Sequence, residues 1–165
     1  MKKMNKKILL IAIFLTIIFQ NIVLIKSEED RIIRMKELNL DSKETYIPVK
    51  SGQKFTIEIE GNPSTGYSWF LETPEKIERS GLLKATNLNK HNSGDYYRSS
   101  ELNKNETEVL RVGSGGLFHF KFLAGEKSGH EEITFIYKRP WDEEDQIKKT
   151  IIVKVINTQE KQNDL

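Results

Sequence analysis

Four segments of the chain alternate between apolar and polar residues with a period of two. In residues 54–60, Phe55, Ile57 and Ile59 fall on one side and polar residues on the other. Because successive side chains of a β-strand point to opposite faces, this pattern predicts strands with one face in a core and the other toward solvent. The same alternation recurs at residues 117–122, 132–137 and 150–156.

Weaker strand patterns lie between the four clear ones, and polar residues separate them. These weaker segments are residues 32–38, 45–49, 67–71 and 77–88. Seven or eight short strands without a convincing helix after residue 27 are typical of an all-β fold, and we expect an immunoglobulin-like antiparallel β-sandwich of seven to eight strands. A β-barrel is the structural alternative.

The first 27 residues differ in composition from the rest. Four lysines precede an apolar run at residues 8–19, and a second apolar patch ends at Lys26 and Ser27. This order is typical of a secretory signal peptide, with cleavage expected after Ser27. An uncleaved anchor is the alternative, because residues 8–25 approach the roughly 20 residues of a membrane-spanning helix, although Gln20 and Asn21 interrupt them.

The basic balance of the chain belongs to this leader. The full sequence carries 26 basic and 24 acidic residues, and five of the lysines lie within residues 1–27, where there is no acid. Residues 28–165 therefore carry a net charge of −3, which gives no support to nucleic-acid binding. Their length is that of one domain with a single core, and we expect a monomer.

Several kinds of chemistry have no residues to support them. The chain has no cysteine, which excludes disulfides and a thiol nucleophile. It has three scattered histidines and neither a GxSxG nor an HExxH motif, so we expect no enzyme, no metal site and no cofactor. A polar stretch near residues 89–107 is expected to be a solvated insertion, and it contains an N-glycosylation sequon at Asn105.

Three connections between the expected strands carry more than turn residues. The first reads Asn62-Pro63-Ser64-Thr65-Gly66-Tyr67, and its proline and glycine predict a tight reversal with Ser64 and Thr65 at the tip. Taken alone, it is also compatible with an ordinary hairpin.

The second connection reads Gly113-Ser114-Gly115-Gly116. It lacks the Lys-Ser/Thr that follows the glycines of a phosphate-binding loop, so we do not expect nucleotide binding. Because glycine has no Cβ, this connection could let another backbone approach closely. Taken alone, it is more simply interpreted as a flexible linker.

The third connection reads Arg139-Pro140-Trp141 and precedes the acidic run at residues 142–145. Arg and Trp are typical anchors of protein interfaces, and the proline fixes the start of the loop. The alternative is a tryptophan that covers the end of the sandwich. Trp69, which follows the first connection in a strand pattern, is expected in the core instead. The acidic run lacks the ligand spacing of an EF-hand and is expected to be a solvated loop.

The three motifs, in this order, resemble those of the chagasin-type inhibitors of papain-like cysteine proteases. That family has an NPTTGY-like first loop, a GxGG second loop and an RPW third loop, and only Ser64 departs here. The resemblance extends over residues 32–156 and places a strand at residues 28–38, where a helical pattern is also possible.

The resemblance implies a function and a set of site residues. The protein would inhibit papain-family cysteine proteases, such as cathepsin L-like enzymes, reversibly and competitively by placing three loops in the active-site cleft. Residues 62–67, 113–116 and 139–141 would touch the protease. Such an inhibitor would be secreted or held in an endosomal or lysosome-like vesicle, without stable membrane insertion after signal cleavage. A non-inhibitory immunoglobulin-like adhesion or ligand-binding module is the alternative.

Overall fold

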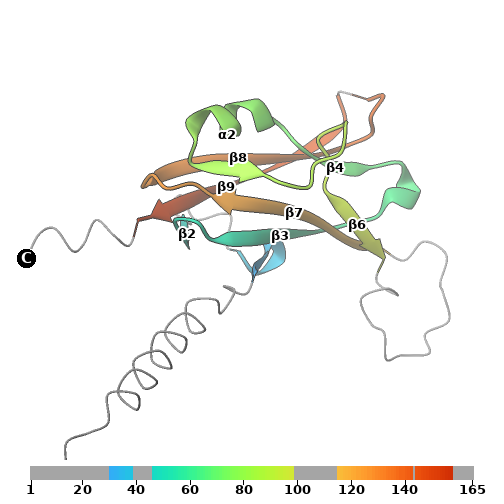
Figure 1. The fold of residues 1–165 in the computed structure, drawn as a ribbon. Coiled ribbons are helices and arrows are strands. Elements are labelled where there is room, and N and C mark those ends of the chain that lie inside the picture. The colour runs from blue at the N-terminus through green and yellow to red at the C-terminus, as the bar shows by residue number, and fades with distance from the viewer. Residues whose placement is uncertain (1–29, 39–45, 99–114, 143, 158–165) are drawn as a thin grey trace, which may run out of the picture.

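In the computed structural model, the described residues are 30–38, 46–98, 115–142 and 144–157, and they form two β-sheets packed face to face (Figure 1). The first sheet contains β1 (Arg31–Arg34), β3 (Lys54–Gly61), β5 (Leu83–Ala85), β6 (Asp95–Arg98) and β7 (Gly116–Ala124). The second sheet contains β2 (Tyr46–Lys50), β4 (Ser68–Leu71), β8 (Gly129–Lys138) and β9 (Gln146–Ile156). The all-β sandwich is confirmed.

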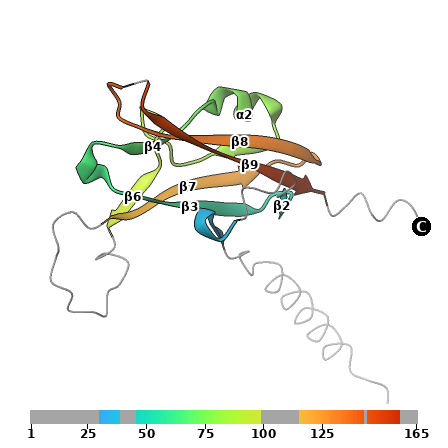
Figure 2. The same cartoon turned by 180° about the vertical axis from the view of Figure 1, so that it is seen from behind.

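The strand order shows two departures from the expected sandwich. The sheets run β1-β3-β7-β5, with β6 also on β7, and β2-β9-β8-β4, so the described residues form nine strands rather than seven or eight. The pairs β1–β3 and β2–β9 are parallel, whereas the other pairs are antiparallel. Both parallel strands come early in the chain and lie at an edge of their sheet (Figure 2).

The core lies between the sheets and follows the sequence alternation. Phe55, Ile57 and Ile59 of β3 are buried as predicted, and phenylalanines of β7 pack beside them. Phe120 of β7 meets Phe135 of β8 across the sandwich, with 4.8 Å between the ring centroids. Burial of each such side chain contributes about 1.5–3 kcal/mol to the free energy of folding. The two sheets therefore hold together without a disulfide.

One predicted strand is wrong. Residues 77–88 contain the end of a short helix, α2 (Pro74–Ser80), a glycine-led turn and then β5. Proline at the first helical turn and Gly81 in the left-handed conformation, with φ of 69°, are the start and stop signals of a helix. The helix buries Ile77, and its seven residues are too few for a clear helical period.

The first half of the polar stretch is not a solvated insertion. Residues 95–98 form β6, which pairs antiparallel with the start of β7, and Ser93 is buried. A Cβ on Gly94 would lie 2.3 Å from the carbonyl oxygen of His119, so the chain approaches β7 closely there. No strand signal is visible in the sequence here because the two half-buried residues of β6, Tyr96 and Tyr97, are adjacent, so apolar and polar residues do not alternate.

Some predictions lie outside the described residues. These are the signal peptide at residues 1–27, the sequon at Asn105, and Gly113 and Ser114 of the second motif. In the part of the chain that the structure describes, no helix has the length and apolarity needed to cross a membrane. The strand predicted at residues 28–38 is present as β1, which is followed by a 3₁₀ turn, η1 (Met35–Glu37).

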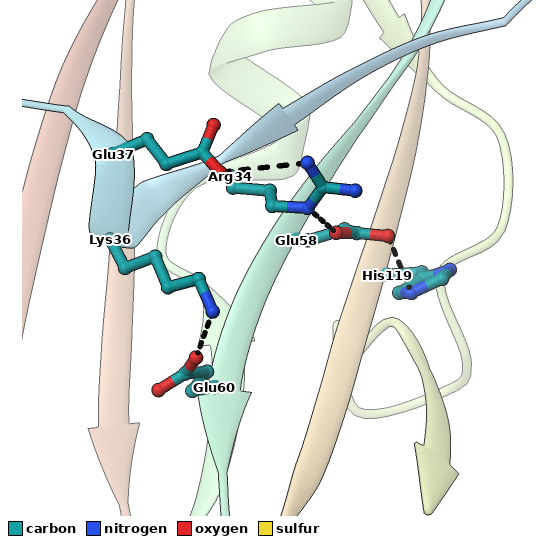
Figure 3. Close-up of polar contacts among 6 residues, drawn as sticks. All are labelled: Arg34, Lys36, Glu37, Glu58, Glu60 and His119. Carbon is teal, nitrogen blue, oxygen red and sulfur yellow. Dashed lines mark hydrogen bonds and ion pairs between the residues drawn. The ribbon is translucent and has the colours of Figure 1, made fainter. Parts of the chain in front are cut away.

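The outer face of the first sheet carries a line of charged side chains (Figure 3). Glu58 is only 7% exposed, and its Oε2 accepts a hydrogen bond from Arg34 Nε at 3.1 Å. Its Oε1 lies 3.2 Å from His119 Nε2, without the alignment of a hydrogen bond. Burial lowers the pKa of His119 below its ordinary value, against the opposing effect of Glu58. Lys121 lowers this pKa further, and Asp95 raises it.

The lowered pKa gives a direction for the pH dependence of stability. The unfolded chain takes up a proton at His119 near pH 6.5, whereas the folded chain does so only at lower pH. The free energy of unfolding should therefore fall as the pH drops below about 6.5. In urea titrations, the free energy of unfolding should fall less between pH 7.5 and pH 5.5 for His119→Gln than for the wild type.

A matched control separates this effect from general acid sensitivity. His130 is exposed on β8, so His130→Gln should lose as much stability between the two pH values as the wild type does. Equal losses for His119→Gln and the wild type would contradict the role given to His119.

Candidate functional site

The first and third connections lie at one end of the sandwich, together with the last residues of the second connection. β3 ends at Gly61 opposite Gly116, where β7 begins, and β8 ends at Lys138 opposite Ser68, where β4 begins. The first loop, residues 62–67, therefore crosses from one sheet to the other (Figure 1). The hairpin interpretation of this loop is wrong, since β3 and β4 belong to different sheets.

Internal hydrogen bonds hold the first loop in a compact turn. Residues Pro63–Thr65 form a 3₁₀ turn, η2, and the side chain of Asn62 caps it by accepting from the Ser64 amide at 3.2 Å. The Asn62 carbonyl oxygen accepts from the Thr65 amide at 3.2 Å and from the Thr65 hydroxyl at 2.7 Å. The tip is exposed at Ser64 and Thr65, while its backbone is already bonded within the loop.

Gly66 brings the first loop into contact with the third loop, which comprises residues 139–142. Its φ of 85° is a left-handed conformation that favours glycine. A Cβ added there would lie 3.3 Å from the Cη2 atom of Trp141 and 3.8 Å from Nε of Arg139. The indole of Trp141 therefore lies over Gly66, yet the residue is 75% exposed. This arrangement leaves a large apolar surface open to a partner.

A stack of aromatic rings joins both loops to the core. The guanidinium of Arg139 lies 4.4 Å from the ring centroid of Tyr67, a cation–π contact. Tyr67 stacks on Tyr137 at 5.2 Å, and Tyr137 packs against Trp69 at 4.9 Å between centroids. The Tyr137 hydroxyl also accepts a hydrogen bond from the Asn62 amide at 3.3 Å. We call the side chains of Arg139, Tyr67, Tyr137 and Trp69 the loop stack.

Trp69 is the buried end of the loop stack. It is 4% exposed, which confirms the expectation that it belongs to the core, and its indole Nε1 donates to the carbonyl oxygen of Glu60 at 2.9 Å. The two tryptophans thus have opposite environments. Trp69 fixes the base of the loops, and Trp141 is displayed at their surface.

The second motif meets the base of the first loop. A Cβ on Gly115 would lie 3.1 Å from the carbonyl oxygen of Gly61 and 3.9 Å from the Cβ of Asn62. A Cβ on Gly116 would lie 2.1 Å from the carbonyl oxygen of Tyr97 in β6. Gly116 therefore needs glycine, and Gly115 packs tightly against the backbone of Gly61. This packing aligns the end of the second loop with the first loop.

The acidic run after Trp141 shapes the third loop. Asp142 Oδ1 accepts from the amides of Glu144 at 3.1 Å and Asp145 at 3.2 Å. The hydroxyl of Tyr67 donates to Asp145, and this bond raises the pKa of Tyr67. In the described ranges, no cluster of three or more His, Asp or Glu side chains is placed to hold a metal ion. The sequence predicted only a solvated loop here, whereas Asp142 and Asp145 also make hydrogen bonds that hold the loop in its conformation.

Sequence reasoning missed two residues that position the site. Tyr137 was counted only as part of a strand, and Asp145 only as part of an acidic run. Tyr137 had a possible signal, since it lies two residues before Arg139 and on the same strand phase as the buried Ile133 and Phe135. No sequence pattern could have indicated Asp145, because its contact with Tyr67 joins residues 78 positions apart.

Comparison with known proteins places the chain in a family. The family model described as the Chagasin family peptidase inhibitor I42 matches residues 48–155. Amoebiasin-1 from Entamoeba histolytica is 29% identical over 104 residues, which cover 63% of this chain and 82% of Amoebiasin-1.

Two solved structures were found to be similar to this chain. The solution structure of Amebosin superposes with a TM-score of 0.50 at 24% identity, covering 78% of this chain and 99% of Amebosin. The cysteine protease inhibitor EhICP2 from Entamoeba histolytica gives a TM-score of 0.49 at 19% identity, covering 77% of this chain and 94% of EhICP2. Because the family model spans more than half of the sequence, this protein belongs to the chagasin family of peptidase inhibitors, I42.

Proposed function

We propose that the protein is a reversible, competitive, tight-binding inhibitor of papain-family cysteine proteases, and that its loops occlude the active-site cleft. The observation that carries this proposal is the contact of Trp141 with Gly66, which joins two exposed loops into one edge. The exposed tip at Thr65 and the exposed indole of Trp141 give this edge a narrow polar part and a wide apolar part. Membership of a peptidase inhibitor family supports the same function.

The conformation of the first loop explains how it would resist cleavage. A protease substrate binds its scissile peptide in an extended form, whereas residues Pro63–Thr65 form a 3₁₀ turn. The Gly66 amide donates to the Pro63 carbonyl oxygen at 2.9 Å, so an extended conformation would break bonds within the loop. Inhibition then comes from filling the cleft, and no chemical step is needed.

The loop stack explains how binding could be tight. Ordering a loop on binding costs free energy, and here the loops are already held by aromatic and hydrogen-bonded contacts. An interface of about 800 Å² per partner is the ordinary size for protease–inhibitor complexes. With little ordering cost, nanomolar affinity, about 12 kcal/mol, is within reach of such an interface.

Enzyme kinetics tests the proposed function directly. The protein is titrated against active-site-quantified papain and a cathepsin L-like protease at several substrate concentrations. We expect stoichiometric inhibition that weakens as the substrate concentration rises. If folded protein inhibits neither enzyme, the proposal fails, and a binding module without inhibitory activity becomes the better account.

Gly66→Ala should weaken inhibition while leaving the fold intact. The alanine would be strained at φ of 85°, and its Cβ would press on Trp141 at 3.3 Å. We expect the inhibition constant to rise at least about tenfold. Gly81→Ala is the matched control, because φ is 69° there and an added Cβ meets nothing within 4 Å. Both variants should lose about 1–2 kcal/mol of stability, and only Gly66→Ala should lose inhibition.

Trp141→Ala should remove the main apolar contact of the third loop. Truncation of a buried aromatic anchor in an interface typically costs about 2 kcal/mol or more, so the inhibition constant should rise at least about 30-fold. Tyr46→Ala serves as the control, since Tyr46 is another exposed aromatic residue, on β2. An unchanged inhibition constant for Trp141→Ala would show that the third loop lies outside the interface.

We also propose that residues 1–27 direct the protein into the secretory pathway and are removed there. The lysine-led apolar run supports this proposal. When the full chain is expressed in a eukaryotic secretory host, N-terminal sequencing of the released protein should begin at Glu28. Retention of the intact chain in the membrane fraction would favour the anchor.

A further inference from the structure

The outer face of the second sheet has a pocket beside the third loop. Its cavity volume is about 490 Å³. Phe70 of β4 and Ile136 of β8 form an apolar floor, and Pro140 of the third loop forms one wall. We call it the side pocket.

A turn on the free edge of β4 forms the opposite wall. The carbonyl oxygen of Asn92 accepts from the amide of Leu71 at 2.8 Å, which fixes the turn against the strand. The side chain of Asn89 caps the turn by accepting from the amides of His91 at 2.9 Å and Ser93 at 3.1 Å. The turn is therefore held in place along the strand, and the side pocket is a built feature of the fold.

The charges in the side pocket are unbalanced. Glu72, the one acidic residue among the described residues that line it, forms an ion pair with Lys148 of β9. Lys138 also lines the pocket, and within the described residues its ammonium group has no hydrogen-bond or ion-pair partner. His91, a second residue with a nitrogen-bearing side chain, also lines the pocket. The pocket therefore offers donors over an apolar floor.

These features together favour one kind of ligand group. A carboxylate accepts hydrogen bonds from ammonium and imidazole N–H groups, and the methylenes of an Asp or Glu side chain suit contact with Phe70 and Ile136. Partial enclosure also strengthens a charge pair relative to one in open solvent.

We propose that the side pocket binds an acidic side chain on the rim of the inhibited protease, with Lys138 as its main partner. This inference rests on the proposed inhibitory function. Pro140 belongs both to the third loop and to the pocket wall, so a protease that covers Trp141 reaches the pocket without any change in the loops. The pocket would discriminate between proteases according to the charge of their rim.

The test uses the papain-family protease that the protein inhibits most tightly. Lys138→Glu should raise the inhibition constant about tenfold at low ionic strength, and less at high ionic strength because salt screens the pair. Lys84→Glu is the matched control, since it makes the same change at an exposed lysine on β5, paired with the opposite end of β7. It should leave the inhibition constant within twofold of the wild type.

Zero-length carbodiimide cross-linking of the wild-type complex supplies a direct readout. The reagent joins a lysine amine to a carboxylate in contact with it, so mass spectrometry should identify Lys138 linked to an Asp or Glu of the protease. The proposed role of the side pocket would be overturned by an inhibition constant for Lys138→Glu equal to that of the control. A complex without a Lys138 cross-link would overturn it as well. A wild-type protein that inhibits no protease would instead overturn the proposed function on which the pocket rests.

Discussion

The loop stack is the interaction on which the exposed edge depends. It runs from Arg139 in the third loop through Tyr67 in the first loop to Tyr137 and then to Trp69 in the core. Each aromatic pair is worth about 0.5–1.5 kcal/mol beyond the burial of its surface, which is modest beside the stability of the domain. Its importance lies in connectivity, because one continuous line of contacts fixes two loops that belong to distant parts of the chain.

Glycine complements this stack by allowing close approach. Gly66 lets the indole of Trp141 lie on the backbone of the first loop, and Gly115 lets the chain before β7 pass beside Gly61. Aromatic side chains thus supply rigidity, and the glycines remove the atoms that would hold the loops apart. The resulting edge is narrow at Thr65, wide at Trp141 and bordered by a pocket lined by Lys138, whose ammonium group has no partner among the described residues.

Much of the architecture was accessible from the sequence, for a clear physical reason. Strands with one buried face must alternate, so the segments around Phe55 and Phe120 were predicted correctly, and the motif order led to the family. The helix α2 and the edge strand β6 were missed. The first buries little besides Ile77 and Pro74. The second has two adjacent half-buried tyrosines between two exposed residues, so neither leaves a periodic signal. The ion pairing at Lys148 and the bond from Tyr67 to Asp145 join distant residues, which local patterns do not encode.

The central claim is that the loops are fixed before a partner arrives. Backbone ¹⁵N relaxation of the protein, free and bound to a papain-family protease, tests this claim most directly. If the loop stack holds the edge, the non-proline residues among 62–66 and 139–142 should show order parameters near 0.85 in both states. Order parameters below about 0.6 in the free protein that rise on binding would contradict the account, because the loops would then be ordered by the protease.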